Sequence, residues 1–270
     1  MHTLRVGLLA VIAGLSAAGG AQASPYDMLV LQDRPALYLA MSAPPGSAVE
    51  GDLSGGGRTG RYFPQSGSPP KTRMPNGDTA TVFDGYTQYL EVRSSPALSV
   101  RPGGALTLEA WIRPDTLQFP SDESDGYVYW AGKGEPGQHE YAGRMYSLTN
   151  SASRPNRISG YAFNLAGGLG SGSYFQDRIK ARQWIHVAVV IDTRPRTGAP
   201  TGTIAIFKNG VLRKTTPLSQ FDVVPEAGNA PLRIATRDLG SFFKGAVGKV
   251  AVYRRALTEE RLKAHFEKMK

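Results

Sequence analysis

Two segments in which apolar residues alternate with others constrain the fold more than any other feature of this sequence. In "ALTLEAWIRP" at 105–114, Leu106, Leu108 and Ile112 share one face, and Trp111 lies on the other. In "RQWIHVAVVID" at 182–192, the alternation gives two faces that are both largely apolar. Because successive side chains of a strand point to opposite sides, both segments are expected to be β-strands. Two apolar faces on one strand further indicate a central strand that is covered on both sides, as where two sheets pack face to face.

Short alternating segments separated by turn residues continue through most of the chain. The 32 glycines and 19 prolines fall between them, which is typical of an antiparallel sandwich. Asn209-Gly210 lies between two alternating runs and predicts a type I′ turn within a hairpin over 203–213. The long polar stretch at 53–78 is expected to hide a short strand near Arg61 to Phe63. Further strands are expected at 26–31 or 36–41, 81–84, 87–92, 127–132, 144–149, 160–165, 231–236 and 246–253.

Only the end of the chain shows helical spacing. Thr258 is a good N-cap, and Leu257 and Leu262 occupy the two positions of a hydrophobic staple. Leu262, Phe266 and Met269 then form one apolar stripe. We therefore expect a short C-terminal helix that folds back onto the sandwich as a lid over an edge.

The first residues indicate export. A short basic start, an apolar run and the small residues of "AQA" are the parts of a signal peptide, which we place at 1–23. The apolar run is too short to cross a bilayer, and no other segment is a candidate span. The expected location is therefore secreted or periplasmic, with residues 24–270 forming one large β domain. With no cysteine, the chain has no disulfide and no thiolate chemistry.

Six motifs occur in order along the mature chain. They are "ALYLAMSAPPGSAVEGDLSGGGRTGRY", "VFDGYTQYLEV", "ALTLEAWIRPD", "QWIHVAVVID", "IFKNG" and "FFKGAVGKVAVYRRALTEERL". In this order the chain resembles the laminin-G-like jelly rolls of the concanavalin A-like lectin/glucanase superfamily. The resemblance implies an all-β, two-sheet antiparallel jelly-roll sandwich.

The resemblance also implies a role. Members are mostly non-catalytic recognition modules that bind glycans or proteins, while a minority of the superfamily cleave polysaccharides. Some relatives bind calcium, for which Asp52 and Asp84 lie in matched motifs, although both also fit ordinary turn chemistry. Gly248 stands where family members often carry an Asp in the final strand. Calcium is thus a possible cofactor, and no complete ligand set can be mapped.

Motifs for catalysis are absent from the sequence. The superfamily's laminarinase-like enzymes carry Glu-x-Asp-x-x-Glu on one strand, and "EGDLSGG" has Gly55 at the last position. Gln183 and His186 are one residue too far apart for the Gln-x-His strand of an alginate-lyase-like site, and His186 is expected to be hydrogen-bonded inside a sheet. The mature histidines are too dispersed for a zinc site. Neither a nucleophile elbow nor a phosphate-binding loop occurs.

Aromatic and basic side chains are the best candidates for binding. The region 125–147 is rich in both, and flat rings can stack on sugars, although aromatics also fill cores. Trp111, Trp130 and Trp184 are assigned to the core, and the loops 114–126, 132–143 and 165–177 are expected on one rim. The candidate ligand-binding residues are Tyr127, Tyr129, Tyr141, Arg144 and Tyr174, of which Tyr141, Arg144 and Tyr174 are expected to be exposed.

The expected function is therefore recognition of a glycan or an extracellular protein, with no catalytic residue. The net charge of +9 is spread along the chain and fits either a basic surface or an anionic partner such as an acidic polysaccharide. Nucleic acid is not an expected partner. The alternatives are a polysaccharide-active enzyme, either a glycoside hydrolase or a polysaccharide lyase with its site residues on different strands, and a structural surface component.

Overall fold

The computed structural model describes residues 23–270, which contain sixteen strands and two α-helices. One set of strands is β1 (Leu37–Leu39), β4 (Lys71–Arg73), β5 (Thr79–Asp84), β7 (Ala105–Pro114), β12 (Ile185–Asp192), β13 (Thr203–Lys208), β14 (Val211–Pro217) and β16 (Lys244–Tyr253). The other is β2 (Val49–Glu50), β3 (Gly60–Phe63), β6 (Tyr89–Val92), β8 (Tyr127–Lys133), β9 (Tyr141–Tyr146), β10 (Ile158–Asn164), β11 (Gly167–Phe175) and β15 (Leu232–Ile234). The helices are α1 (Pro25–Gln32) and α2 (Glu259–Lys268), with short 3₁₀ turns at Pro96–Leu98 and Leu218–Phe221.

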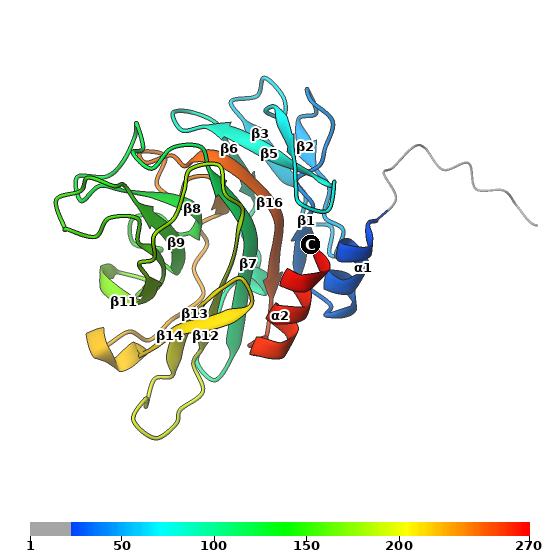
Figure 1. Cartoon of the computed structure of the whole chain (residues 1–270). Helices are drawn as coiled ribbons and strands as arrows, with labels where there is room; N and C mark the ends of the chain where they lie inside the picture. Colours follow the sequence, from blue (N-terminus) through cyan, green and yellow to red (C-terminus); the bar gives the residue numbers. More distant parts are fainter. Residues whose placement is uncertain (1–22) are drawn as a thin grey trace, which may run out of the picture.

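The strands form two sheets that pack against each other (Figure 1). Sheet A has the order β14-β13-β12-β7-β16-β5-β4, with β1 paired to β16. Sheet B has the order β11-β10-β9-β8-β15-β6-β3-β2. Every ladder between these strands is antiparallel, which confirms the predicted two-sheet jelly-roll sandwich. The predicted signal peptide lies outside the described residues, apart from Ala23.

The two diagnostic segments are neighbours in sheet A. β7 pairs with β12, so that Ala110 lies opposite Val187 and Leu108 opposite Val189. Their inward faces belong to the core between the sheets. Their outward faces, with Trp111 and Ala188, are also buried, in a second apolar cluster. The strand at 185–192 is therefore covered on both sides as predicted, but helices provide the second cover rather than a sheet.

Both helices lie on the outer side of sheet A, where Figure 1 shows them next to each other and away from β8, β9 and β11. The side chain of Thr258 accepts a hydrogen bond from the Arg261 N–H, and Leu257, Leu262 and Met269 are buried, as the sequence predicts. The helix packs over the central strands β7, β12 and β13 through its apolar stripe. The helix also reaches the edge strand β14, where the Leu212 N–H donates to Glu259, so the expected lid over an edge is correct in part and the cover extends to the central strands as well.

A buried polar network ties these helices to sheet A. Glu109 on β7 is fully buried and lies 2.7 Å from His186 Nε2 and 2.9 Å from His265 Nδ1. The other ring nitrogen of His265 lies 2.9 Å from Asp33, which also accepts hydrogen bonds from Arg261. His186 is thus hydrogen-bonded inside the sheet, as predicted, and the network extends through α2 to the end of α1.

Of two local predictions near the N-terminus, one is corrected and one is confirmed. The 26–31 alternative for the first strand is wrong, because these residues form α1, and β1 lies within 36–41 instead. Ser24 and Asp27 form a capping box and Pro25 occupies the first turn, which is a sequence signature of a helix start. The predicted strand within 53–78 is present as β3, and β4 is a second one.

The glycine-rich segment 165–177, expected to be a rim loop, is mostly strand β11. The neighbouring strand β10 explains the glycines. A Cβ on Gly172 would lie 2.5 Å from the ring of Tyr161, and one on Gly170 would lie 2.5 Å from that of Phe163. The rings of β10 therefore occupy the space that side chains on β11 would fill.

Loop positions also differ from expectation, whereas the hairpin is confirmed. Residues 115–126 precede β8 and residues 134–140 follow it, so these two loops lie at opposite ends of that strand and not on one rim. Asn209 and Gly210 have φ of 54° and 78° between β13 and β14, as the predicted turn requires.

Candidate functional site

Three of the predicted binding residues lie together on the outer face of sheet B. Tyr127 and Tyr129 come from β8 and Arg144 from the adjacent β9, where Tyr129 pairs with Arg144. The residues between them, Val128 and Trp130, point into the core, so alternation turns the tyrosines outward. No helix packs on this face among the residues that the structure describes. The sequence therefore placed these side chains correctly on one sheet face, but Tyr129 is 1% exposed and Arg144 is partly buried rather than exposed as expected.

The other two predicted residues lie elsewhere. Tyr141 is 1% exposed, belongs to the core, and donates a hydrogen bond to the Leu98 carbonyl, so its expected exposure is wrong. Tyr141 is three residues from the outward-facing Arg144 on β9, so alternation turns it to the inner side, where it pairs with Lys133. Tyr174 is half-buried on β11 at the edge of the same outer face, with Arg157 and Lys214 3.8 and 3.9 Å from its ring centroid. The hydrogen bond and charge of Lys214 lower its pKa.

The outer face of sheet B carries an aromatic–arginine cluster, which we define as Tyr127, Tyr129, Arg144, Tyr161, Phe163 and Arg237. The guanidinium carbon of Arg144 lies 4.2 Å from the ring centroid of Tyr127 and 4.6 Å from that of Tyr161. That of Arg237 lies 4.7 Å from the ring of Tyr129 and 5.2 Å from that of Phe163. All four distances are within the range in which a cation is attracted to the face of a ring.

Half of this cluster was missed from the sequence. Tyr161 and Phe163 are separated by one residue on β10 and therefore point to the same side. The sequence could have indicated them, because two aromatic residues at alternate positions of "ISGYAFN" are followed by glycines on the next strand. Arg237 comes from the connection between β15 and β16 and has no local signal. It reaches the cluster because Gly132 on β8 leaves space for it: a Cβ there would lie 2.9 Å from the Arg237 side chain.

Donors in the cluster lack protein partners. Arg237 is only 7% exposed, yet its Nε and Nη1 make no hydrogen bond within residues 23–270. The Nε of Arg144 also has no hydrogen-bond partner in these residues, while its Nη2 donates to the Tyr129 hydroxyl at 3.2 Å. Buried polar groups are nearly always hydrogen-bonded, so these three guanidinium nitrogens, which are themselves buried, are unpaired donors that an external acceptor reaches only if neighbouring side chains shift. Burial lowers the pKa of Arg237 from its high usual value, and the group remains a cation at neutral pH.

A pocket of about 430 Å³ adjoins the cluster. It is lined by Arg237, His139, Glu135 and Asp238, among others. His139 is half-buried, with its ring 6.0 Å from that of Phe163. Burial, and then the charges of Arg237 and Arg144, lower the pKa of His139, so its ring is neutral near pH 7. The pocket thus combines fixed cations with a neutral imidazole.

A carboxyl pair lies beside the same cluster. Glu123, from the loop before β8, is hydrogen-bonded to Asp238. This bond, followed by burial and the charge of Asp238, raises the pKa of Glu123 to about 7. Burial alone would raise the pKa of Asp238, but hydrogen bonds from Glu123 and from the N–H groups of Ser241 and Gly240 lower it. The pair therefore loses a proton, held mainly by Glu123, as the pH rises through about 7.

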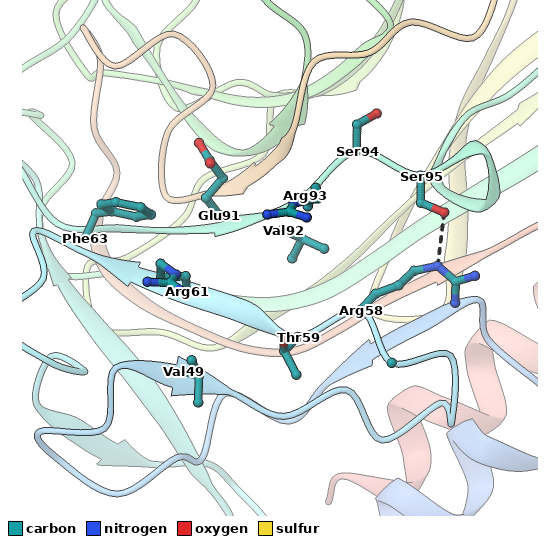
Figure 2. A pocket seen from close by; sticks show the side chains of 11 residues that line it. Val49, Arg58, Thr59, Arg61, Phe63, Glu91, Val92, Arg93, Ser94 and Ser95 are labelled. Carbon is teal, nitrogen blue, oxygen red and sulfur yellow. Dashed lines mark hydrogen bonds between the residues drawn. The ribbon is translucent and has the colours of Figure 1, made fainter.

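A second pocket, of about 480 Å³, opens on the other half of sheet B (Figure 2). Its charged lining residues are Arg58, Arg61, Arg93 and Glu91, and we call it the arginine pocket. Arg58 donates to the Ser95 hydroxyl at 3.2 Å and to the Ala36 carbonyl. Figure 2 shows Arg61 on β3 and Arg93 just after β6.

The two calcium candidates serve as turn acceptors. Asp52 accepts hydrogen bonds from the N–H groups of Tyr38 and Arg58, and Asp84 from those of Tyr86, Thr87 and Gln88. In the described part of the chain, no group of three or more His, Asp or Glu side chains could hold a metal ion. Calcium binding stays a prediction of the resemblance.

Comparison with known proteins identifies the class of this fold. The described residues form a jelly-roll sandwich, and residues 84–263 match the family model Laminin_G_3, of the concanavalin A-like lectin/glucanases superfamily. The chain belongs to this family. A comparison with curated proteins finds no match. Across residues 23–270, no helix has the length and apolar character needed to cross a membrane.

Solved structures with the same fold include binding domains. The binding domain of botulinum neurotoxin DC, in complex with rat synaptotagmin II, is 11% identical with a TM-score of 0.62, over 89% of this chain and 52% of that chain. The botulinum neurotoxin serotype D ligand-binding domain, in complex with N-acetylneuraminic acid, is 11% identical with a TM-score of 0.61, over 89% and 52%. This chain thus spans about half the length of the toxin domains.

A third similar structure matches along nearly its whole length. It is domain 4 of AbnA, a GH43 extracellular arabinanase from Geobacillus stearothermophilus, in complex with arabinotriose. It is 16% identical with a TM-score of 0.57, over 86% of this chain and 97% of that chain. At such identities the similarity concerns the fold alone.

Proposed function

We propose that this protein is a non-catalytic recognition module that binds carbohydrate through the aromatic–arginine cluster on the outer face of sheet B. One observation carries the proposal: two guanidinium groups are held among four rings with three of their nitrogens unpaired, on the sheet face without a helix. Rings offer flat apolar surfaces to sugars, and guanidinium groups offer fixed donors to hydroxyl or carboxylate oxygens.

The similar structures support the same class of function. Arabinotriose is bound by the arabinanase domain and N-acetylneuraminic acid by the serotype D toxin domain, while another toxin domain is in complex with a protein. A protein surface is therefore the competing ligand. We favour carbohydrate, because the adjoining pocket of about 430 Å³ has the size of a small-ligand site. The proposal includes export, which the predicted signal peptide at 1–23 supports.

The test is binding of the mature chain to a panel of polysaccharides, with calorimetry for each hit. Tyr161→Ala removes one ring over Arg144 and is expected to weaken binding about tenfold or more, equivalent to about 1.4 kcal/mol. Tyr86→Ala is the matched control, because Tyr86 is an exposed tyrosine outside the cluster. Equal affinities of the two variants would exclude the cluster as the binding site. The absence of any glycan hit, together with capture of one protein partner, would favour the structural alternative.

The carboxyl pair favours a second candidate function, cleavage of a polysaccharide. Glu123 and Asp238 have pKa values moved in opposite directions, as in an acid–base pair, but two carboxyl groups in hydrogen-bond contact are closer than the roughly 5 to 9.5 Å that separates glycosidase carboxyl groups, so the pair would act as one proton donor. They come from different connections, as the sequence-based enzyme alternative requires. Sustained release of reducing ends from a panel polysaccharide, abolished by Glu123→Gln, would establish the enzyme. Stable complexes without release support the binding module.

A further inference from the structure

We propose that the arginine pocket is a second subsite for the same ligand, and that this ligand is an acidic polysaccharide carrying carboxylate or sulfate groups. The inference rests on the proposed function, which it extends from one end of sheet B to the other.

The pocket and the cluster share one face. Paired positions run across sheet B from Val49 to Arg61, Glu91, Arg233 and Gly132. Directly paired residues of antiparallel strands point to the same side. Arg61 and Glu91 therefore lie on the side of the sheet where Gly132 makes room for Arg237.

The pocket has positive charge that the protein does not neutralise. Arg61 and Arg93 are exposed, and their guanidinium groups form no hydrogen bond or ion pair with any residue in 23–270. Glu91, the one acid in the lining, accepts a hydrogen bond from Arg233 Nε at 2.8 Å. Since Glu91 is engaged there, the guanidinium groups of Arg61 and Arg93 remain available to an anion.

Arg233 connects the two regions. It is 5% exposed and bonds Glu91 on one side and Glu135 on the other, while its Nη1 donates to the Arg237 carbonyl. From β3, which carries Arg61, to β10, which carries Tyr161, there are five strand-to-strand steps. At about 4.8 Å per step, the two subsites are on the order of 24 Å apart, which suits a chain of several sugar units.

The chemistry of these groups selects an acidic ligand. Guanidinium forks bind the two oxygens of a carboxylate or sulfate at once, which a neutral sugar cannot offer. An extended polymer with regularly spaced anionic groups can present one to the arginine pocket and a sugar ring to the cluster. Neutral glycans offer Arg61 and Arg93 only uncharged hydroxyl oxygens, which form weaker hydrogen bonds than a carboxylate or sulfate does.

The experiment compares two variants with the same loss of charge in the mature chain. One is Arg61→Ala with Arg93→Ala, in the pocket. The control is Lys263→Ala with Lys268→Ala, on exposed positions of α2 over sheet A. The probes are polygalacturonate, heparin and neutral arabinan, titrated at low and high salt, and urea unfolding checks that both variants are folded. Polygalacturonate and heparin separate carboxylate from sulfate as the recognised group.

We expect the pocket variant to bind its acidic polymer at least about tenfold more weakly than the control, with a smaller salt dependence and unchanged binding to arabinan. Equal losses of affinity in the two variants would overturn the proposed subsite, because such losses would reflect the net charge of the protein alone. Equal affinity of wild type for a single-stranded oligonucleotide would overturn the ligand class. If the pocket variant loses binding while Tyr161→Ala does not, the aromatic–arginine cluster is excluded as the glycan site, and the arginine pocket is retained as a binding site for the acidic polymer.

Discussion

The outer faces of the two sheets differ in whether their buried charged side chains find hydrogen-bond partners. On sheet A, Glu109 is fully buried beneath α2 and is hydrogen-bonded by His186, His265 and Tyr253, and within this network the Nδ1 of His186 lacks a partner in the described residues. On sheet B, Arg237 is almost as deeply buried, but two of its nitrogens have no partner in the described residues. Satisfied buried networks rigidify a structure, whereas unsatisfied donors lower stability unless a ligand meets them. Under the proposed function, the face with helices stabilises the fold and the face without them in the described residues binds the ligand.

The largest effect is expected for Glu109→Gln, which tests the stabilising face. Removing one partner of a buried ion pair leaves the remaining buried groups without their counter-charge. The free energy of unfolding should therefore fall by about 3 to 5 kcal/mol. Urea unfolding measures this fall, with Glu226→Gln on an exposed loop as the control. Glycan affinity of the folded variant should be unchanged. A midpoint equal to that of the control would contradict the assignment of stability to this network.

The same network has a defined acid sensitivity. Burial alone would raise the pKa of Glu109, but the charge and hydrogen bonds of His265 and His186 lower it well below the usual value. Its stabilisation is therefore present above the usual pKa of a glutamate and is lost as the pH falls through the lower folded value. Wild type should lose stability on acidification over that range more steeply than Glu109→Gln.

The next effect concerns the recognition face. Arg237→Lys keeps the charge but removes the planar fork and its unpaired Nε, so glycan affinity should fall about tenfold. Arg101→Lys, on an exposed turn, is the matched control. Calorimetry on both variants decides the question. Retention of full affinity by Arg237→Lys would show that only charge matters on this face.

The face with helices was largely predictable from the sequence, because its determinants are local. Alternation at 105–114 and 182–192, the N-cap Thr258 and the Asn209-Gly210 turn each lie within a few residues of what they specify. The exception is α1, whose capping box was overlooked in favour of a strand. The partners of Glu109 were not predictable, since His265 and Asp33 reach it only through the packing of both helices.

The candidate site was predictable only in part, for a corresponding reason. Tyr127, Tyr129 and Arg144 follow from the composition of adjacent strands. Tyr161 and Phe163 join them through the register between β9 and β10, and Arg237 through a loop that crosses β8. Tyr141 faces the core because alternation along β9 places it on the side opposite Arg144, a signal that the sequence does contain. Non-local pairing therefore decided which side chains meet.

A smaller effect is expected for Thr258→Ala at the start of α2. Its hydroxyl accepts the hydrogen bond of the Arg261 N–H, and loss of such a cap costs about 1 kcal/mol. Thr258→Ser keeps the oxygen and should stay close to wild type in urea unfolding. If both variants lose the same amount of unfolding free energy, the methyl group of Thr258 rather than its capping hydrogen bond accounts for the loss. Either variant should leave glycan binding intact, which again separates the two faces.

The smallest effect is a pH dependence of binding on the recognition face. The Glu123 carboxyl, with a pKa of about 7, faces Asp238, Arg144 and Arg237. Because this pKa is raised, Glu123 is largely protonated below 7 and becomes an anion as the pH rises through 7. The added negative charge repels an acidic polymer and offsets the nearby guanidinium groups, by an amount that solvent keeps to about 1 kcal/mol.

Affinity for the acidic polymer should accordingly weaken a few-fold between pH 6 and 8, and Glu123→Gln should remove this change. Neutral arabinan, which has no charge for Glu123 to repel, should show a smaller change. Calorimetry at both pH values on wild type and variant measures the difference. An unchanged pH profile in Glu123→Gln would mean that another group titrates, and the half-buried His139 in the adjoining pocket would be the next to substitute. Because the pKa of His139 is lowered, this side chain becomes a cation, and attracts an anion, only in a more acidic range than the one in which Glu123 titrates. The pH at which the binding affinity changes therefore distinguishes His139 from Glu123.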